Sequence, residues 1–592
     1  MSSGRQSGSA AKRSRPPGPP AHRLVALFVI MALGLSGILV RLVVLQVNEA
    51  SAYETLALDQ RVRDIPLPAS RGTIFDRNGQ ELAMSLPAKA VFADPAIVDN
   101  PSSEARVVAS MLGLDRPSVQ AKLSTKATDT GRPIRFVYLA RGVSVPTARA
   151  LERKQLPGIG FQDESRRYYP AGALAPQVLG FVGVDGTGLA GLESQYESKL
   201  AGRPGREVVE EGLDGTFIPQ GTSHDVPPVA GGELMLTIDK DIQYRAQVSL
   251  AHAVKDNGAK GGTLIAMDPR TGDILAMATY PWFDPNRFAE ADPDRLRNRA
   301  VTDMYEPGSA NKVITAAAAL EEGVIRPTDR LEVPDRLQVS NKLFHDAHEH
   351  PTEQMTLGDI LAYSSNIGAI KVAERLGRDR LSAYLHRFGF GHVTGLGFPG
   401  EARGLLAPPD QWWGTSMGTI PIGQGIAVTP LQMASVYATV ANGGVWIEPR
   451  LVRAIVGPNG RERDVASSPT RRVVSAETAG QLVRMLAYGV EVGTGTEAQI
   501  PGYWVAGKTG TARKPLTGAL GYSDHYVASF IGFTPATRPA LVVAVVLDEP
   551  ETVFGGVAAA PLFRDVARFA LAKLRVAPAP RPPLPPHAVP TG

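Results

Sequence analysis

The sequence predicts an α+β multidomain protein that carries a single N-terminal transmembrane helix. Its 592 residues exceed what one hydrophobic core holds, because domains usually contain about 100–250 residues. An uncharged apolar run lies near the N-terminus, at residues 24–40. Strand-like segments lie at both ends of the C-terminal half, with Ala- and Leu-rich helical stretches between them. This pattern predicts an antiparallel sheet packed against helices.

The apolar run LVALFVIMALGLSGILV has the length of a membrane anchor. Seventeen helical residues rise about 25 Å. If Arg41 snorkels and 42–47 continue the helix, the segment crosses a hydrocarbon core of ~30 Å. A cleaved signal peptide is the alternative, since a basic region also precedes its apolar core. The run is longer than a usual signal core, and no small-x-small site follows it directly, so we expect an uncleaved anchor.

Positive charge on the N-terminal side sets the expected orientation. Residues 1–23 contain no acid and five basic residues: Arg5, Lys12, Arg13, Arg15 and Arg23. We therefore expect a single-pass protein of the cytoplasmic (inner) membrane, with a cytoplasmic N-terminus and an extracytoplasmic remainder. The formal net charge of +4 offers no basic surface for nucleic acid. The absence of cysteine excludes disulfides and thiolate catalysis.

Composition divides the chain into five parts. Gly, Ser, Pro and Arg dominate its start, Pro dominates its end, and GTSHDVPPVAGG at 221–232 resists regular structure. The expected parts are a disordered cytoplasmic tail (1–23), the anchor (24–46), an N-terminal domain (47–225), a C-terminal domain (226–575) and a Pro-rich disordered tail (576–592).

Local patterns predict the main elements. Asn78-Gly79 favours a hairpin turn, and residues 233–239 alternate as a strand does. The other expected elements are a hairpin (262–268 and 273–279), helices at 310–321, 357–376 and 561–575, and strands at 503–512, 525–534 and 540–548.

The first candidate for chemistry is Ser309, which follows Pro307-Gly308 at the start of a helix. Lys312 lies three residues later and projects from the same helix face. A hydroxyl beside an amine forms a nucleophile and base, provided that burial or a neighbouring cation keeps the amine neutral. Alone, Ser-x-x-Lys is also what a capped helix with a solvated lysine looks like.

A second candidate follows at Ser364 and Asn366, in the segment AYSSNIG. The hydroxyl can relay a proton, and the amide can hold a peptide carbonyl. By itself, this segment is also typical of a turn or a helix cap without a catalytic role.

The third candidate is Lys508-Thr509-Gly510-Thr511, within a strand-like stretch. Lys508 supplies a second positive charge, and the two threonine hydroxyls can bind a carboxylate. Gly510 has no side chain to obstruct a substrate backbone that pairs with the strand.

The three segments together, in this order, are the signature of penicillin-binding proteins and class A β-lactamases. The chain resembles the class B penicillin-binding proteins, most closely the division transpeptidases of the FtsI type. Further stretches carry the resemblance: RGTIFDRNG (71–79), RRYYP (166–170), LGFVGVDGTGLAGLE (179–193), TGLGFPGE (394–401), GQGIAVTPLQ (423–432) and AGKTGTA (506–512). It implies an elongated pedestal domain, similar to the family's dimerisation domain, and a transpeptidase domain of the penicillin-binding and serine β-lactamase fold.

The resemblance also implies a reaction. Ser309 is acylated by the D-alanyl-D-alanine end of a peptidoglycan stem peptide, D-alanine leaves, and the amine of a second stem peptide forms the cross-link. Lys312 acts as base, Ser364 relays the proton and Asn366 holds the substrate amide. Lys508, Thr509 and Thr511 position the terminal carboxylate, and the N–H groups of Ser309 and Thr511 form the oxyanion hole.

No metal or organic cofactor is expected, and β-lactams should acylate Ser309. Asn366 favours a division enzyme over an elongation enzyme, in which Asp often stands at this position. The implied partners are lipid II-derived strands, the membrane, and a polytopic glycosyltransferase with other division proteins.

Other functions remain open at this point. A D,D-carboxypeptidase differs only in using water as acceptor, and an elongation-type transpeptidase differs in its place of action. A β-lactamase shares the three segments but needs a further base for deacylation. A non-catalytic penicillin sensor or division scaffold is a fourth alternative. The cluster His345-Asp-Ala-His-Glu-His350 has the ligand types of a zinc site, although such a composition is usual in a solvated loop.

Overall fold

The structure is a computed structural model that describes residues 21–49, 62–210, 224–464, 467–516, 518 and 521–583. It contains two compact units, each built from two stretches of chain. One comprises Met1–Leu67 with Gly205–Pro227, and the other comprises Pro68–Pro204 with Pro228–Gly592. The two compact units thus divide the chain differently from the domain boundary that we expected between residues 225 and 226.

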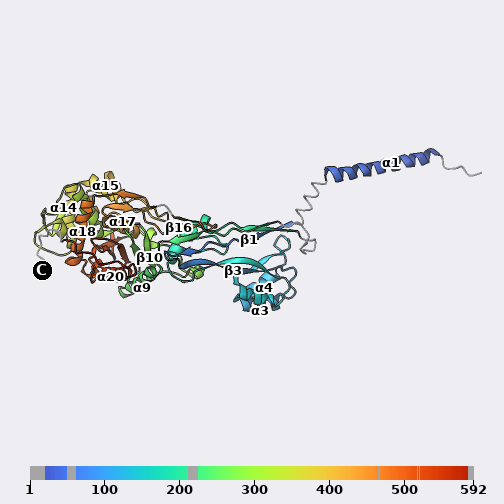
Figure 1. Ribbon diagram of the computed structural model, residues 1–592, viewed down its shortest axis with the longest axis horizontal. Coiled ribbons are helices and arrows are strands. Elements are labelled where there is room, and N and C mark those ends of the chain that lie inside the picture. The colour runs from blue at the N-terminus through green and yellow to red at the C-terminus, as the bar shows by residue number, and fades with distance from the viewer. Residues whose placement is uncertain are drawn as a thin grey trace, which may run out of the picture. The chain divides into compact units, whose positions relative to one another are not determined.

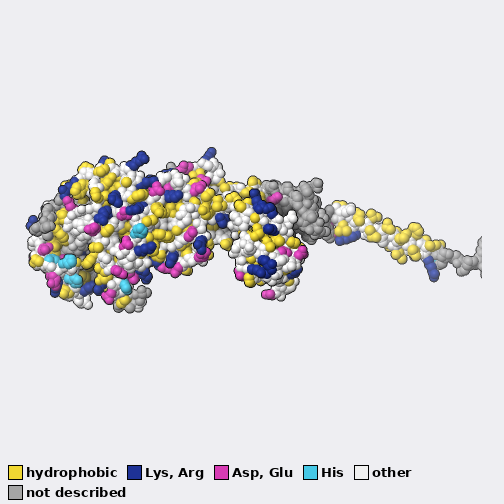
Figure 2. All heavy atoms as spheres, turned by 90° about the horizontal axis from the view of Figure 1, so that it is seen from below, with side chains coloured by type: hydrophobic (Ala, Val, Ile, Leu, Met, Phe, Trp, Pro, Cys, Tyr) yellow, Lys and Arg dark blue, Asp and Glu magenta, His cyan; other side chains and the backbone are white. Residues whose placement is uncertain are grey.

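The first unit holds the expected anchor and a small sheet. Helix α1 spans Ala21–Val43 and continues as a π-helical turn, η1, over Val44–Asn48. Within the described residues, Ala21–Val47 is the one segment long and apolar enough to cross a membrane, and none of it is buried (Figure 2). The sheet is antiparallel, in the order β1 (Val62–Leu67), β6 (Gly205–Glu210), β7 (His224–Val226).

The second unit contains a seven-stranded sheet in which the predicted Asn78-Gly79 hairpin is confirmed. Asp76 accepts hydrogen bonds from the N–H groups of Asn78 and Gln80 at 2.7 and 2.8 Å, which closes the turn. The order is β17-β16-β8-β2-β3-β4, with β5 also pairing β3. Its strands are β2 (Ile74–Phe75), β3 (Glu81–Ala93), β4 (Val137–Ser144), β5 (Ile159–Tyr168), β8 (Glu233–Leu236), β16 (Val452–Val456) and β17 (Glu462–Asp464).

Three helices cover the far part of β3 and β4. They are α3 (Pro101–Leu112), α4 (Arg116–Ser124) and α5 (Val145–Glu152), and they enclose a small separate core around Val91 and Val108 (Figure 1). Each helix is capped at its N-terminus by a side chain that accepts a hydrogen bond from a backbone N–H of the first turn, and each has a proline in that turn. The capping residues are Asn100 for α3, Asp115 for α4 and Ser144 for α5.

A buried ion network joins the three N-terminal segments that carry the family resemblance. Glu193, which is fully buried, accepts from Arg71 Nε and from Arg167 Nε, each at 2.6 Å, and from the Tyr169 hydroxyl at 3.3 Å. Arg71 also pairs with Glu197 at 2.7 Å. Burial alone lowers the pKa of Arg71, but Glu193 and Glu197 outweigh it and raise that pKa. These charges are therefore matched, and they tie residues 71, 167 and 193 into one structure.

The same unit contains a five-stranded antiparallel sheet in the order β10-β9-β21-β20-β19. The hairpin and the three later strands predicted from the sequence are confirmed as β9 (Gly261–Met267), β10 (Ile274–Tyr280), β19 (Ala506–Pro515), β20 (Tyr522–Thr534) and β21 (Leu541–Asp548). β21 is buried on both faces, as its unbroken apolar sequence requires. Val543 and Val545 face the core with α9 (Lys240–Asp256) and α20 (Ala560–Lys573), which lie side by side in Figure 1.

A helical layer covers the other face, towards which Val542 and Ala544 point. It contains η3 (Gly308–Asn311), α12 (Lys312–Glu321), α13 (Leu357–Ala362), α14 (Asn366–Leu376), α15 (Arg378–Arg387), α17 (Pro430–Ala441) and α18 (Ala476–Glu491). The continuous helix expected over 357–376 is wrong. Ser364 has φ +64°, a left-handed conformation that no α-helix accommodates, so the chain breaks between α13 and α14.

Short elements complete this unit. They are α6 (Pro176–Leu179), α7 (Gly191–Gln195), α8 (Glu197–Leu200), η2 (Pro285–Glu290), α10 (Pro293–Leu296), α11 (Arg299–Thr302), β11 (Leu331–Val333), β12 (Arg336–Val339), β13 (Lys342–His345), β14 (Glu353–Met355), η4 (Pro409–Gln411), α16 (Ser416–Thr419), η5 (Ile420–Ile422), β15 (Val445–Ile447), β18 (Thr470–Arg472), η6 (Thr496–Ala498) and α19 (Gly555–Ala558).

The first part of the Pro-rich segment, 576–583, contacts the folded chain. Tyr503 donates to the Val576 carbonyl at 2.7 Å, and the Arg581 guanidinium lies 4.7 Å from the centre of the Trp504 ring. Ala579 and Pro582 are buried. Of the tail expected to be disordered from residue 576, the remaining residues, 584–592, lie outside the described part of the chain.

Candidate active site

Ser309 lies in the tight turn η3 that leads into helix α12. Gly308 before it adopts φ +54° and donates its N–H to the Gly423 carbonyl at 3.0 Å. A Cβ on Gly423 would lie 2.1 Å from the Gly308 carbonyl oxygen, so this contact admits no side chain. The turn leaves Ser309 partly exposed at the start of a buried helix, which is where a nucleophile must lie to meet a substrate.

Lys312 is buried and reaches the second predicted segment. Its Nζ donates to the Ser364 carbonyl at 2.5 Å, to Asn366 Oδ1 at 2.7 Å and to the Ser364 hydroxyl at 3.3 Å. Burial lowers the pKa of Lys312 to about 7, although Asp346 acts in the opposite direction. The amine is therefore neutral in a large fraction of molecules at neutral pH, as a general base requires.

Ser364 and Asn366 hold this position through the break between α13 and α14. Ser364 takes the left-handed conformation, which costs about 1–3 kcal/mol for a residue with a side chain and has to be imposed by its surroundings. Asn366 begins α14, and its Nδ2 donates to the His345 carbonyl at 3.0 Å. The carbonyl of Ser364 and the Oδ1 of Asn366 therefore face Lys312 together.

Lys508 is the second buried lysine of the site. It is 2% exposed, and its Nζ donates to the Thr509 carbonyl at 3.2 Å and to Thr509 Oγ1 at 3.1 Å. Burial, with a smaller contribution from repulsion by Lys312, holds the pKa of Lys508 well below its usual value. The two lysines thus act on each other electrostatically, although they come from sequence positions 196 residues apart.

The strand that carries Lys508, β19, is an edge strand of the five-stranded sheet. Among the described strands only β20 pairs with it, so its other backbone edge is the place where an extended peptide could add as a further strand. Thr509 Oγ1 lies 2.8 Å from Thr494 Oγ1, and Thr511 Oγ1 accepts from Gly555 N–H at 3.2 Å. Both hydroxyls are thus fixed by neighbours.

Gly510 has a use beyond the one predicted. A Cβ at this position would lie 2.3 Å from Ser529 Oγ and 2.9 Å from the Pro307 carbonyl oxygen. The missing side chain lets β19 approach the turn that carries Ser309.

The backbone of Thr511 faces this turn as well. The Thr511 carbonyl oxygen lies 2.8 Å from the position of a Cβ on Gly308. In an antiparallel strand the N–H and C=O of one residue point to the same side. The Thr511 N–H is therefore directed towards Ser309, where it and the Ser309 N–H can bind an oxyanion.

Comparison with known proteins assigns the chain to a family. Residues 262–568 match the penicillin-binding protein transpeptidase domain, and residues 66–236 match the penicillin-binding protein dimerisation domain. The chain belongs to the class B penicillin-binding proteins of the FtsI type.

Relatives match this penicillin-binding protein over nearly its full length. It is 36% identical to penicillin-binding protein PbpB of Mycolicibacterium smegmatis, covering 95% of this chain and 92% of the relative. It is 33% identical to the peptidoglycan D,D-transpeptidase FtsI of Escherichia coli K12, covering 96% of each chain. The crystal structure of penicillin-binding protein 3 from Mycobacterium tuberculosis in complex with aztreonam aligns with a TM-score of 0.69 at 32% identity, over 88% of this chain and 100% of that one.

Two buried carboxylates of this penicillin-binding protein were not among the predicted site residues. Glu306 accepts from the Gly425 N–H at 2.9 Å and from the Tyr522 hydroxyl at 3.1 Å, and burial raises its pKa. Asp346 bonds to the start of α14. The partners of Glu306 lie 119 and 216 residues away, and the partners of Asp346 in and next to α14 lie 19 to 21 residues away. No local pattern reveals these contacts, although Asp346 lies within the cluster at residues 345–350 and Glu306 lies next to the Ser309 segment.

The cluster at residues 345–350 is organised around Asp346 as a hydrogen-bond acceptor. His350 Nε2 lies 3.2 Å from Asp346 Oδ2, and His345 Nδ1 lies 2.8 Å from the Asp346 carbonyl oxygen. Across the described ranges, no three His, Cys, Asp or Glu side chains are grouped as metal ligands.

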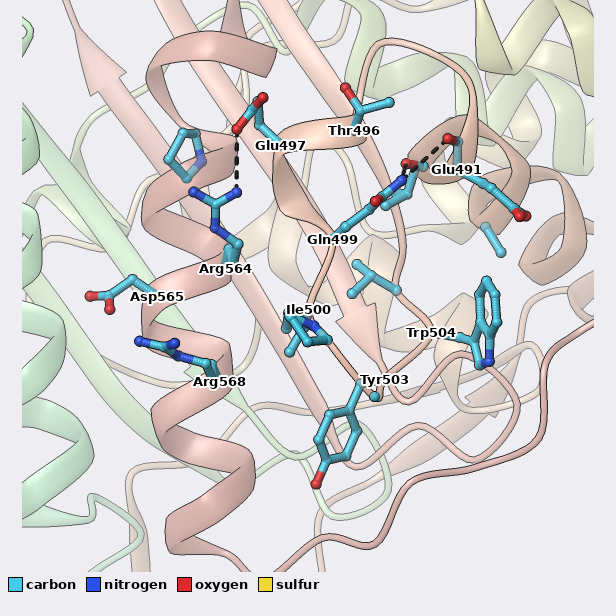
Figure 3. A pocket seen from close by; sticks show the side chains of 16 residues that line it. Glu491, Thr496, Glu497, Gln499, Ile500, Tyr503, Trp504, Arg564, Asp565 and Arg568 are labelled. Carbon is cyan, nitrogen blue, oxygen red and sulfur yellow. Dashed lines mark hydrogen bonds and ion pairs between the residues drawn. The ribbon is translucent and has the colours of Figure 1, made fainter. Parts of the chain in front are cut away.

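A cavity of about 1010 Å³ lies away from these residues, between the end of α18, the 496–505 loop and α20 (Figure 3). Arg564 and Glu497 pair across it at 3.3 Å, and Gln499 donates to the carbonyls of Val490 and Glu491. None of the eight predicted site residues lines it. In this penicillin-binding protein, a cavity of this size therefore does not mark the position of the predicted catalytic residues.

Proposed function

We propose that this chain is a peptidoglycan D,D-transpeptidase that cross-links stem peptides through an acyl-enzyme on Ser309. The observation that carries the proposal is the buried Lys312, three residues after Ser309 and bonded to both Ser364 and Asn366. The similarity to the peptidoglycan D,D-transpeptidase FtsI of Escherichia coli supports it.

In the first half-reaction Ser309 Oγ attacks the carbonyl carbon of the penultimate D-alanine. The proton of the hydroxyl passes to neutral Lys312, and the developing oxyanion is held by the N–H groups of Ser309 and Thr511. The amide bond to the terminal D-alanine then breaks, and its nitrogen receives a proton by way of Ser364. An ester on Ser309 and free D-alanine result.

In the second half-reaction the amine of another stem peptide attacks this ester. Lys312 accepts the amine proton, the ester bond breaks, and Ser309 regains its proton as the new amide forms. Each step therefore uses the same base and the same oxyanion hole. No metal or organic cofactor takes part in either step.

The remaining predicted residues position the donor peptide. Asn366 holds the substrate amide, while Lys508, Thr509 and Thr511 hold the terminal carboxylate. Gly510 allows the peptide backbone to lie along the free edge of β19. The same contacts fit a penicillin, whose carboxylate and strained amide resemble those of the peptide, and a structural neighbour is described in complex with ampicillin.

The anchor and the family support a proposal for the cellular setting. We assign α1 to a single membrane span with a cytoplasmic N-terminus, because the basic residues lie before it. We place catalysis outside the membrane, in septal wall synthesis, with a polytopic glycosyltransferase and other division proteins as partners. We also propose that residues 47–225 form the pedestal domain and that residues 226–575 form the transpeptidase domain.

A fluorescent penicillin tests the proposal. The full chain in detergent should be labelled covalently, and Ser309→Ala should lose the label while keeping its unfolding midpoint. Labelling of the variant at the wild-type level would contradict the assignment of Ser309.

A stem-peptide substrate separates the alternatives. With an added amine acceptor, D-alanine release should be accompanied by a cross-linked product. Hydrolysis alone, with acceptor present, would identify a D,D-carboxypeptidase. Rapid turnover of penicillin would identify a β-lactamase.

A further inference from the structure

The side chain of Asp346 makes an unusual number of contacts at the start of α14. Its Oδ1 accepts from the N–H of Asn366, in a very short contact, and from the N–H of Ile367 at 3.0 Å. Its Oδ2 accepts from the Ser365 hydroxyl at 2.7 Å and lies 3.2 Å from His350 Nε2. One carboxylate thus satisfies two of the orphan donors of this eleven-residue helix.

The carboxylate is buried. Asp346 is 8% exposed, and it reaches α14 from the hairpin that contains β13, about twenty residues earlier in the chain. A buried carboxylate is costly unless hydrogen bonds satisfy it, which these four partners do. The helix N-terminus adds a favourable field for its negative charge.

What Asp346 holds is the segment that binds Lys312. Ser364 is in its strained left-handed conformation directly before the residues that Asp346 contacts, and the Ser364 carbonyl and Asn366 Oδ1 are the two closest acceptors of Lys312 Nζ. Because strain persists only where neighbours enforce it, the Asp346 bonds to Ser365 and Asn366 keep those acceptors in place.

We propose that Asp346 is a positioning residue of the acylation reaction, which holds Ser364–Asn366 against Lys312 and whose negative charge governs how readily that amine accepts and releases a proton. This inference rests on the function proposed above and adds a residue to it. None of the hydrogen bonds of the Asp346 side chain in the described part of the chain reaches Ser309, so we infer that it acts through Lys312.

The charges around Lys312 give this role a direction. Asp346 favours the ammonium form and raises the pKa of Lys312, whereas burial lowers it and Lys508 on β19 repels the same charge. On the other side of Asp346, burial lowers the pKa of His350, but its bonds to the Pro351 carbonyl and to Asp346 raise it overall. A protonated His350 therefore offsets part of the Asp346 charge.

The acylation rate should fall at low pH, where Lys312 becomes protonated, and we call this part of the pH–rate profile the acid limb. Two substitutions should accordingly move the acid limb in opposite directions. Asp346→Asn removes the negative charge, so Lys312 stays neutral to lower pH and the limb should move down by about one pH unit. The plateau rate should fall about tenfold or more, because Asn cannot accept all four bonds. His350→Gln removes the offsetting cation and keeps a donor, so its limb should move to higher pH by a smaller amount.

The experiment is the second-order rate of labelling by a fluorescent penicillin between pH 5.5 and 9, on the full chain in detergent. Asp359→Asn is the matched control: Asp359 is also buried and caps the preceding helix, through Thr356, but does not contribute to the charge on Lys312. It should lower the rate, if at all, equally at every pH.

A lower rate of Asp346→Asn with an unmoved limb would show a purely structural residue and overturn the proposal. So would a limb of His350→Gln that moves with that of Asp346→Asn rather than against it, and this second variant decides the matter if the first does not fold. Failure of the wild type to be labelled would instead refute the function proposed for the whole site.

Discussion

Two buried groups of cations lie in the larger compact unit, and their surroundings differ. Arg71 and Arg167 share the buried carboxylate of Glu193, each at 2.6 Å. Lys312 and Lys508 have no ion pair within 4 Å among the described residues. Their ammonium nitrogens donate instead to backbone carbonyl oxygens, to hydroxyl oxygens and, for Lys312, to the side-chain amide oxygen of Asn366.

The difference shows in the proton affinities. Carboxylates raise the pKa of Arg71 above its ordinary value despite burial. Burial lowers the pKa of both lysines, and for Lys312 the more distant charge of Asp346 offsets this only in part. A matched buried charge serves as structure, whereas an unmatched one becomes a group that can give up its proton. The chain thus uses arginine where charge has to persist and, at Lys312, a lysine where charge has to be lost.

Lys312→Arg gives the largest expected effect, since it forces a permanent charge into the unmatched group. General-base catalysis contributes about 10²–10⁴-fold, so acylation by penicillin should fall by that order. Stopped-flow or gel-based labelling measures the rate. Arg71→Lys is the converse substitution, and it should lower the stability of the protein more than it lowers the acylation rate of the folded molecules. An equal loss of acylation in both variants would contradict the proposed difference between the arginine group and the lysine group.

Glu193→Gln breaks the matched group. It leaves two arginines buried without their shared carboxylate, which costs about 3–5 kcal/mol when one partner of a buried pair is removed. The urea midpoint of the full chain should fall accordingly, while the pH profile of labelling stays in place. Glu290→Gln, in an exposed pair with Arg287, is the control and should barely change the midpoint.

The pH dependence of acylation gives the next effect. Lys312 has to be neutral to act as a base, and its pKa lies at about 7. The rate should level off above that pH and fall about tenfold per pH unit below it, because the neutral fraction falls in that proportion. A rate that stays constant down to pH 5.5 would show that Lys312 is not the base.

Thr494→Val gives the smallest effect. It removes the hydroxyl that lies 2.8 Å from Thr509 Oγ1 and leaves both lysines untouched. One neutral hydrogen bond contributes about 0.5–1.5 kcal/mol, so labelling should slow less than about tenfold with an unchanged pH profile. A shift of the profile would place Thr494 in the electrostatics of the lysine pair.

Most of the fold could be predicted wherever a local pattern determines it. The apolar run became α1, the unbroken Val-rich stretch became β21, and Asn78-Gly79 became a turn. The ordered recurrence of three short segments also predicted that residues near 309, 364 and 508 meet. Each of these patterns, including each of the three segments taken singly, occupies only a few neighbouring residues of the chain.

What could not be predicted depends on distant partners. The break at Ser364 lies where Lys312 bonds to Ser364 and Asp346 bonds to Ser365, and the Ala- and Leu-rich sequence on either side favours an unbroken helix. The contacts of Glu306 with Gly425 and Tyr522 likewise have no local signal. Nor does the Pro-rich composition after residue 576 show that Arg581 stacks on Trp504.

Peptide mapping after treatment with benzylpenicillin tests the central claim most directly. The account predicts one penicilloyl adduct per chain, on the peptide that contains Ser309 and Lys312, with none in Ser309→Ala. It also predicts that lowering the pH below about 7 slows its formation without changing its position. An adduct on another residue, or no adduct on a folded chain, would contradict the claim that Ser309 is the nucleophile and Lys312 its neutral base.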